Sequence, residues 1–402
     1  MKRDNNMSKR MKRVERAVAY TYLLAKHFIL SPIARFWFGR KHIWIVCERG
    51  TDARDNGYHF FRHLRENHPE QKVYYVIDRK SADYPCVAAL GDVVQLDSLK
   101  HWLLFLGADV RISTHNNGGV PGGCWRYRRF ISHHKGNGKV VFLQHGVTKD
   151  DMTGLYRENT NFDLFICGAK PEYEYVLSRF GYTEDEAKLT GFARFDQLQQ
   201  FTIKRQVLIM PTWRDWLSLG FDGAELSERD VEHSDYVQRW SVLLKNDRIR
   251  ALAQKYDVQF VFYPHYEMQP FLHLFGEGND QIVFADFVHY NVQNLLKESM
   301  LLITDYSSVF FDFAYMQKPV LYYQFDEDEY RKRHYSQGYF AYRRDGFGEV
   351  VTEEKELLDL LEEYLAGDCH LKPVYQKRID GFFPLHDDKN CERIFREIKN
   401  LT

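Results

Sequence analysis

Short apolar runs alternate with amphipathic stretches along most of the chain, beginning at His42. In the first half, five runs have the length and apolar character of buried strands: 42–48, 72–78, 109–114, 140–144 and 164–168. Between them, residues 57–68 and 98–107 have the apolar spacing of amphipathic helices. This alternation of strands and helices predicts a parallel sheet with helices on both faces.

The same alternation starts again at Gln206. The strands expected here are 206–210, 258–263, 281–286, 300–304 and 319–323, and the helices are 236–255, 291–298, 307–317 and 353–365. Segment 191–205 separates the two series and marks a domain boundary. The chain of 402 residues is long enough for two domains. The pattern therefore predicts an α/β protein with Rossmann-like domains at 42–200 and 201–402, facing across a cleft, with ligands beyond the carboxyl ends of the strands.

Residues 1–41 differ from the rest because they carry eleven lysines and arginines against two acidic residues. The apolar stretch 17–38 is interrupted by Lys26, Pro32 and Arg35, so no run reaches the roughly 20 apolar residues of a spanning helix. The basic and aromatic residues that follow do not form a signal-peptide cleavage site. We expect a basic amphipathic helix in the plane of an anionic membrane, peripheral on its cytoplasmic face. The alternative is a solvated basic helix packed on the first domain.

Composition excludes several other classes of protein. The formal net charge is -1, which offers no general argument for nucleic-acid binding. The six cysteines form no CxxC pair and indicate reduced core residues rather than disulfides or a zinc site. Neither GxxxxGK[ST] nor GxGxxG after a strand occurs, which argues against P-loop and dinucleotide-binding enzymes. No cofactor and no metal site are expected, and the oligomeric state stays open.

A cluster of polar residues lies between an expected strand and an expected helix, in the sequence TDYSS from Thr304 to Ser308. At this position backbone N–H groups at the start of a helix are free and can bind an anion. The serine and threonine hydroxyls can donate further hydrogen bonds to phosphate oxygens. Ordinary helix capping by Ser or Asp is the alternative, but it accounts for only one or two of these residues.

The longer segment around this cluster, residues 302–330, resembles the signature of the CDP-glycerol glycerophosphotransferase family. Segments 142–151, 191–198, 210–216 and 263–267 agree with the same family in order, so the resemblance covers roughly 140–345. It implies a GT-B architecture. It also implies transfer of a polyol phosphate, most simply glycerol phosphate, from a CDP-polyol to a teichoic-acid-like or capsular polymer, with release of CMP. The acceptor would be a polyol-phosphate chain or a lipid-linked saccharide.

Two histidines follow expected strands directly, and the resemblance implies that they are catalytic. His145 comes after the run 140–144, and an imidazole with an ordinary pKa near 6.5 can accept a proton from the acceptor hydroxyl. His265 comes after the run 258–263 and Pro264, where it can donate to the pyrophosphate and stabilise the leaving CMP. For each, the alternative is a structural histidine in a turn.

The remaining candidate site residues all follow expected strands or lie at the domain boundary. We expect Thr304, Ser307 and Ser308 to hold the pyrophosphate, and Asp305 to hold the turn or to contact the polyol. Thr212 and Arg214 can reach phosphate, with a salt bridge as the alternative for Arg214. Arg194 and Asp196 border the cleft in the family, and a structural ion pair is the simpler interpretation.

A different function is compatible with the same architecture. A GT-B glycosyltransferase that uses a nucleotide sugar in cell-surface polysaccharide synthesis would share the fold but attack carbon instead of phosphorus. A membrane-bound assembly partner without activity is a third possibility. Its weakness is that His145, His265 and the TDYSS cluster are all present together.

Overall fold

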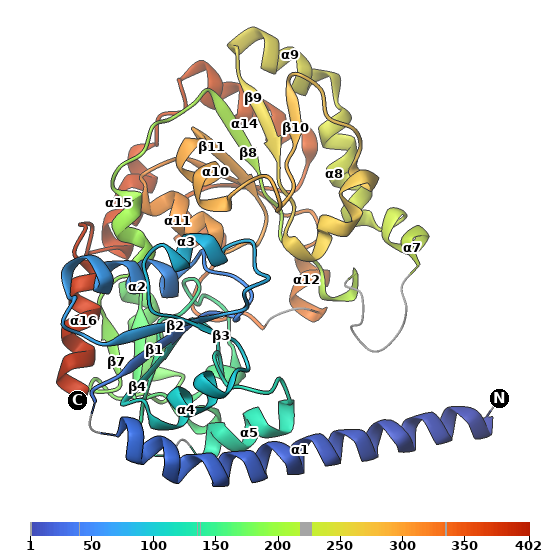
Figure 1. Ribbon diagram of the computed structural model, residues 1–402. Coiled ribbons are helices and arrows are strands. Elements are labelled where there is room, and N and C mark those ends of the chain that lie inside the picture. The colour runs from blue at the N-terminus through green and yellow to red at the C-terminus, as the bar shows by residue number, and fades with distance from the viewer. Residues whose placement is uncertain (1, 40, 135, 137, 218–226, 334–335) are drawn as a thin grey trace. The chain divides into compact units, whose positions relative to one another are not determined.

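The computed structural model describes residues 2–39, 41–134, 136, 138–217, 227–333 and 336–402 (Figure 1). The chain divides into two compact units. The first comprises Met1–His145, Thr153–Asp196 and Asp387–Thr402, and the second comprises Gly146–Met152 and Gln197–His386. Each unit is built on one parallel sheet.

The sheet of the first unit has seven strands in the order β3-β2-β1-β4-β5-β6-β7. All of its neighbouring strands are parallel, and Trp44 of β1 lies opposite Val73 of β2 and Val110 of β4. The strands are β1 Trp44–Cys47, β2 Val73–Ile77, β3 Val93–Gln95, β4 Val110–Ser113, β5 Lys139–Phe142, β6 Leu164–Cys167 and β7 Ala187–Leu189. Because the chain reverses its winding direction between β1 and β4, this sheet has its switch point there.

The helices of the first unit are α1 Lys2–Phe38, α2 Asn56–Asn67, α3 Tyr84–Ala88, α4 Leu99–Gly107, α5 Trp125–His133, α6 Lys170–Ser178 and α16 Asn390–Leu401, with 3-10 turns η1 Thr153–Leu155, η2 Arg157–Asn159 and η3 Ala193–Leu198. Helices α2, α4 and α6 contact this sheet, while α1 packs on α4 and α5 and α16 packs on α2. Helix α4, for example, begins at a local capping residue, because the Ser98 hydroxyl accepts a hydrogen bond from the His101 N–H.

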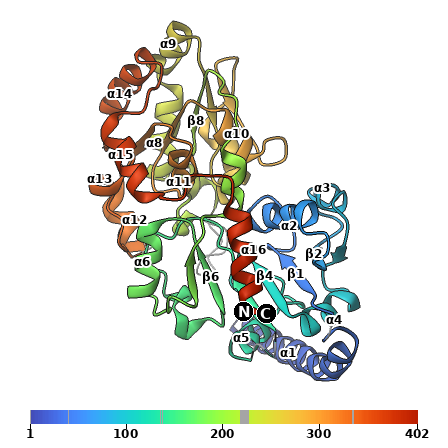
Figure 2. The same cartoon turned by 90° about the vertical axis from the view of Figure 1, so that its left-hand side faces the viewer.

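The sequence analysis assigned residues 201–402 to the second domain, but the C-terminal helix α16 belongs to the first unit. Its apolar side chains Cys391, Ile394 and Ile398 are buried, so the helix needs an apolar surface to cover them. It packs beside α2 (Figure 2). The difference arises because an amphipathic pattern states that a helix has a buried face without stating which sheet that face covers.

The sheet of the second unit has six parallel strands in the order β10-β9-β8-β11-β12-β13. The strands are β8 Gln206–Ile209, β9 Gln259–Phe262, β10 Ile282–Phe284, β11 Leu301–Thr304, β12 Val320–Tyr323 and β13 Gly348–Val351. This order repeats that of the first unit, and its switch point lies between β8 and β11. The expected α/β fold with two parallel sheets is therefore confirmed.

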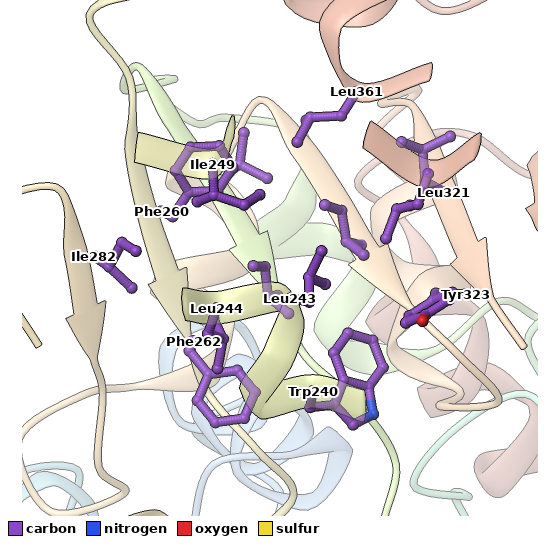
Figure 3. Close-up of a cluster of buried hydrophobic side chains, with 14 of the residues drawn as sticks. Trp240, Leu243, Leu244, Ile249, Phe260, Phe262, Ile282, Leu321, Tyr323 and Leu361 are labelled. Carbon is purple, nitrogen blue, oxygen red and sulfur yellow. The ribbon is translucent and has the colours of Figure 1, made fainter. Parts of the chain in front are cut away.

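The second unit has its core where α8, α9 and α14 cover one face of the sheet. Figure 3 shows Trp240 and Leu243 of α8 beside Phe262 of β9 and Tyr323 of β12, all buried. The helical elements of this unit are α7 Glu228–Glu232, α8 Asp235–Lys245, α9 Asp247–Tyr256, α10 Val292–Glu298, α11 Val309–Tyr315, α12 Glu327–Arg333, α13 Tyr342–Asp345, α14 Glu354–Ala366 and α15 Pro373–Phe382, with η4 Asp215–Leu217 and η6 Tyr266–Phe275.

Two kinds of element escaped the sequence pattern. The strands β3, β7 and β13 were not expected; they are three or four residues long and each lies at a sheet edge, where few side chains need to be apolar. The single helix expected over 236–255 is two helices. Asn246 ends α8 in an extended conformation, and its side chain accepts from the Arg248 N–H to begin α9.

Residues 2–38 form one helix, α1, which packs on α4 and α5 (Figure 1). Leu23 is buried in one apolar cluster with Trp102 and Phe105 of α4, and buried Ala34 lies against Gly107 of α4. Contrary to the sequence argument, Val14–Phe38 is long and apolar enough to cross a membrane, judged by length and composition only. One such helix near an N-terminus is weak evidence for a span, because core helices and signal sequences pass the same test.

Candidate active site

His145 lies three residues beyond β5, which pairs with β4 next to the switch point of the first sheet. The segment before it is fixed by Asn56, the first residue of α2, whose amide donates to the carbonyls of Leu143 (3.2 Å) and Gln144 (2.8 Å). Gln144 has φ 63°, a left-handed conformation that is uncommon outside glycine. These constraints project the His145 ring beyond the carboxyl edge of the sheet, where the residue is accessible to solvent although neighbouring groups such as the stacked His115 ring partly desolvate it.

The hydrogen bond of His145 defines its tautomer. Nδ1 lies 3.2 Å from the carbonyl oxygen of Thr114, and a carbonyl can only accept, so Nδ1 carries the proton and Nε2 keeps its lone pair. The pKa of His145 is lowered, first by desolvation and also by Arg194 and Arg49, while Asp55 and the Thr114 carbonyl oppose this shift. A neutral imidazole with an unprotonated Nε2 is the form that a general base requires.

His115 is a functional candidate that the sequence analysis missed. Its ring stacks on that of His145, with centroids 4.7 Å apart and planes at 8°. Arg49 donates to its Nε2 (3.2 Å), so its Nδ1 carries the proton toward the Thr114 hydroxyl (2.8 Å). Burial, His145 and Arg49 together lower the pKa of His115 to about 3. The signal was available, because His115 follows the 109–114 run just as His145 follows 140–144.

Arg194 and Asp196 have structural partners within the first unit. Arg194 forms an ion pair with Asp55 (2.9 Å) and donates to the His145 carbonyl (3.3 Å), so it supports the backbone beneath the histidine. The Asp196 carboxylate accepts from the backbone and side chain of Asn390 and from the Cys391 N–H, which caps α16. These contacts favour the structural interpretation over a direct role in substrate binding.

In the second unit, an ion-pair network joins the loops that follow β8, β11 and β12. The Arg214 guanidinium contacts Asp305 at 2.9 Å and Asp326 at 2.8 and 3.0 Å, and all three side chains are buried. Asp305 also accepts from the Thr212 and Tyr306 N–H groups, at 2.7 and 2.6 Å. Arg214 thus forms the salt bridge that was left open as the alternative to phosphate binding. Asp305 holds the turn.

The hydroxyl residues of the TDYSS cluster divide into two groups. The Thr304 hydroxyl is buried and donates to the Met210 carbonyl (2.7 Å), so it links β11 to β8 and is not directed at a ligand. Within the described part of the chain, the hydroxyls of Ser307 and Ser308 form no hydrogen bond, and Ser308 is exposed. Thr212 is buried, and its N–H donates to Asp305. Ser307 and Ser308 are therefore the better phosphate candidates.

His265 follows β9 and is held in a defined orientation. Its ring stacks on Trp213, with centroids 5.8 Å apart and planes at 16°. Its Nδ1 accepts from the Glu267 N–H at 3.4 Å, which places the proton on Nε2. Trp213 belongs to the loop after β8, so the ring lies at the carboxyl edge of the second sheet. An Nε2–H in this position is a donor suited to an anionic oxygen.

A polar groove of about 430 Å³ lies in the first unit and begins directly after His115. Its lining comes from the loop after β4, from α5 and from η2: Asn116, Asn117, Trp125, Arg128, Arg129, Ser132, His133 and Asn159. Arg128 and Arg129 form no ion pair with any residue that the structure describes. No acidic residue occurs between Asp109 and Asp150, so the groove is strongly basic.

The glycine-rich segment 116–123 connects β4 to α5. Gly118 packs so closely that a Cβ there would overlap the Ser113 hydroxyl and lie 2.8 Å from the Glu48 carbonyl. Val120 is buried in the core. The segment is therefore packed on the carboxyl edge of the first sheet, and only its Asn116–Asn117 end lines the groove.

Two doubly wound parallel sheets of this order, with histidines at their carboxyl edges, define a GT-B-like α/β protein. The chain belongs to the CDP-Glycerol:Poly(glycerophosphate) glycerophosphotransferase family, whose model matches residues 29–400. This confirms the family resemblance of segments 142–330 and extends it to most of the first 140 residues.

Individual relatives agree with the family. The minor teichoic acid biosynthesis protein GgaB of Bacillus subtilis (strain 168) is 33% identical over 369 residues, 90% of this chain and 40% of GgaB. The teichoic acid poly(glycerol phosphate) polymerase of the same strain is 24% identical over 393 residues, 89% of this chain and 48% of that protein. This chain therefore spans less than half the length of these two relatives. The solved wall teichoic acid polymerase TagF has the same fold, with a TM-score of 0.66 at 18% identity over 97% of this chain and 98% of that chain.

Proposed function

We propose that this protein transfers a polyol phosphate, most simply glycerol phosphate, from a CDP-polyol to a hydroxyl of a teichoic-acid-like or capsular polymer. The observation that carries the proposal is the family match over residues 29–400, within which His145 presents an unprotonated Nε2 at the edge of a parallel sheet. The two relatives named above support it, since their names refer to teichoic acid synthesis and to poly(glycerol phosphate).

In the proposed reaction the acceptor oxygen attacks the phosphorus that carries the polyol. A P–O bond forms to the acceptor, the P–O bond to CMP breaks with its electron pair, and the acceptor proton moves to Nε2 of His145. Ser307, Ser308 and the Nε2–H of His265 donate to the pyrophosphate oxygens and to the departing CMP. The first unit would then act on the acceptor and the second would bind the CDP-polyol. Arg194, Asp196, Thr304, Asp305, Thr212 and Arg214 would support these groups.

A direct assay tests the function. Purified protein is incubated with a polyol-phosphate acceptor and, separately, with CDP-glycerol, CDP-ribitol and common nucleotide sugars, and nucleotide release is followed. We expect CMP from a CDP-polyol. Release of UDP or GDP from a nucleotide sugar would instead support the glycosyltransferase, and no release with any donor would support a non-catalytic assembly partner.

The basic groove is the proposed binding site of the acceptor. A polyol-phosphate chain carries one negative charge per repeat, which complements Arg128 and Arg129 along the groove. The groove begins next to His115, which stacks on His145, so a chain lying in it would reach the proposed base. A lipid-linked saccharide with a phosphate could use the same contacts.

Removing the two arginines should weaken acceptor binding without impairing chemistry. We expect Arg128→Ala with Arg129→Ala to raise KM for a polyol-phosphate acceptor about tenfold or more, because two charge-assisted contacts to phosphate are lost. The salt dependence of KM should fall, and kcat at saturating acceptor should change little. Steady-state kinetics measure this, with Arg179→Ala, an exposed arginine outside the groove lining, as the control. An unchanged KM would remove the groove from the proposal.

We also propose that α1 attaches the protein to the cytoplasmic face of an anionic membrane. Its outward face is apolar, and these side chains are 42–86% exposed: Val14, Val18, Tyr22, Ile29, Ile33, Phe36 and Trp37. Val14, Val18 and Tyr22 are four residues apart, as are Ile29 and Ile33, so these side chains share one side of the helix, away from buried Leu23 and Ala34. An exposed apolar stripe of this length on a basic segment suits the headgroup region of a bilayer.

Charge on the apolar stripe should therefore detach the protein from membranes. Ile29→Glu with Phe36→Glu should lower binding to vesicles containing anionic phospholipid at least tenfold, because burial of both side chains is lost. Cosedimentation measures the effect, and Val374→Glu, an exposed apolar position on α15, is the control. Equal binding by the variant and the control would contradict attachment through α1.

A further inference from the structure

Two histidines and a glutamate from distant parts of the chain meet in the first unit, apart from the residues assigned to the proposed reaction. His63 lies in α2 and His68 directly follows it, while Glu392 lies in the first turn of α16, which packs beside α2 (Figure 2). The Glu392 Oε2 is 2.9 Å from Nε2 of His68 and 3.6 Å from Nε2 of His63. All three ligand atoms lie within 4.8 Å of one another.

Two of these distances, 2.9 and 3.6 Å, are close to those between neighbouring ligands of a tetrahedral metal ion. Zn²⁺ binds imidazole nitrogen and carboxylate oxygen at about 2.0–2.2 Å, which puts neighbouring ligand atoms of a tetrahedron about 3.4 Å apart. The Nε2 of His63 is buried and makes no hydrogen bond to any residue in the described ranges. A buried polar atom without such a partner is uncommon, and here it is directed at a carboxylate that a second imidazole already contacts.

The surroundings orient these groups as they do around protein metal sites. Behind His68, Glu70 Oε1 lies 3.6 Å from Nδ1, which is longer than a hydrogen bond but on the side from which a carboxylate supports a metal-bound imidazole. The ring of Phe395 stacks on His68 at 3.7 Å. Arg396 donates to Oε1 of Glu392 at 2.9 Å, which leaves Oε2 as the ligand oxygen.

The ring of His63 is held in the same way. Its Nδ1 lies 3.3 Å from the side-chain amide of Asn67, one turn further along α2. The same Nδ2 of Asn67 donates to the His63 carbonyl at 3.1 Å, so Nδ1 of His63 accepts and its proton lies on Nε2. A metal bound at Nε2 would displace that proton. Both imidazoles direct Nε2 toward the Glu392 carboxylate.

We propose that His63, His68 and Glu392 bind a divalent transition metal of the Zn²⁺ type, with solvent completing the coordination. The bound ion would join α16 to α2 and so fasten the segment Asp387–Thr402 to the first unit. The site does not depend on the proposed transfer reaction. It stabilises the fold because an ion that binds only the folded state raises the free energy of unfolding.

The test uses the full chain with Cys86→Ser, because Cys86 is an exposed thiol that could bind zinc by itself. Isothermal titration of metal-free protein with Zn²⁺ should give one equivalent of saturable binding. The thermal midpoint should rise by about 5 °C at a hundredfold excess over Kd. Co²⁺ in place of Zn²⁺ should give visible absorption bands of a tetrahedral N/O site without a thiolate charge-transfer band.

Two variants and one control decide the result. Glu392→Gln, which keeps the shape of the side chain, and His68→Ala should each weaken Zn²⁺ binding at least tenfold and abolish the thermal shift. His289→Ala removes an exposed histidine that pairs with Asp286, and it should leave both readouts unchanged.

Absence of stoichiometric binding, or equal binding by Glu392→Gln, would reduce the cluster to a histidine–glutamate ion pair and overturn the proposal. Far-UV circular dichroism checks that each variant is folded. If His68→Ala does not fold, Glu392→Gln alone is enough to test the metal site. CMP release is followed in the same variants and should be unaffected, so failure of the metal proposal is distinguishable from failure of the proposed transfer.

Discussion

Replacing His145 by alanine should lower the rate of polyol-phosphate transfer about 10²- to 10⁴-fold while the protein stays folded. The side chain is exposed, so little packing is lost. What disappears is Nε2, the atom whose lone pair is left available by the Nδ1 bond to Thr114. The magnitude is that expected for removal of a general base. The rate of CMP release at saturating donor and acceptor measures the effect, and circular dichroism checks the fold.

The pH dependence separates catalysis by His145 from a merely structural role. A general base must be neutral, and the pKa of His145 is lowered, so activity should persist below pH 6.5 and fall only as the pH drops through that lowered value. The charged and titratable groups around the ring are Asp55, Arg194, Arg49 and His115. Asp55 raises the pKa, so Asp55→Asn should move the acid limb to still lower pH.

The matched control is His233→Ala, which removes an exposed histidine from the second unit and should leave transfer unchanged. Near-normal turnover of His145→Ala would remove this residue from the mechanism. If His145→Ala lowers the rate strongly but Asp55→Asn leaves the pH dependence of the rate unchanged, His145 would have a positioning role instead of acting as the base.

Replacing Arg214 by methionine should lower the free energy of unfolding by about 3–5 kcal/mol. The substitution leaves Asp305 and Asp326 buried without their cation, and uncompensated buried charge has a cost of this order. Burial lowers the pKa of Arg214, but Asp305 and Asp326 outweigh this and raise it, so the residue is charged in the folded state. The Asp305 pKa is raised by desolvation and lowered by Arg214, and without Arg214 it should rise further.

Urea denaturation measures the loss in Arg214→Met. The control is Arg250→Met, which breaks an exposed ion pair with Asp247 and should cost at most about 1 kcal/mol. Adding Asp305→Asn to Arg214→Met should cost less than the sum of the two single changes, because the second substitution removes one stranded charge. A loss in Arg214→Met no greater than in the control would show that the network does not stabilise the second unit.

Much of the architecture could be predicted because its cause is local. A strand buried on both faces must be apolar throughout, and this alone located ten of the strands, including β1, β5 and β11. In a parallel sheet, the residues after each strand gather at one edge. The polar residues found there, His145, His265 and Ser307–Ser308, were therefore recognisable as site candidates.

Roles within the site depended on partners that are remote in sequence. From the sequence alone, Arg214 could bind either a phosphate or a carboxylate. Because β8 pairs with β11, the loops that follow these two strands lie at the same edge of the sheet, and Arg214 forms an ion pair with Asp305. Likewise, Asp196 became the cap of α16 only because that helix returns to the first unit. No spacing rule relates these positions, which lie 91 and 195 residues apart.

By itself, the sequence determined the alternation of elements, the two parallel sheets, the family and the residues at the strand ends, because periodicity and adjacency are properties of neighbouring positions. Only the tertiary structure decided which polar groups satisfy one another. It stacked His115 on His145, buried the charges of Arg214 with two carboxylates, and brought Glu392 to His63 and His68. The physical reason is that hydrogen bonds and ion pairs act between groups close in space, and the crossovers of the two sheets set those distances.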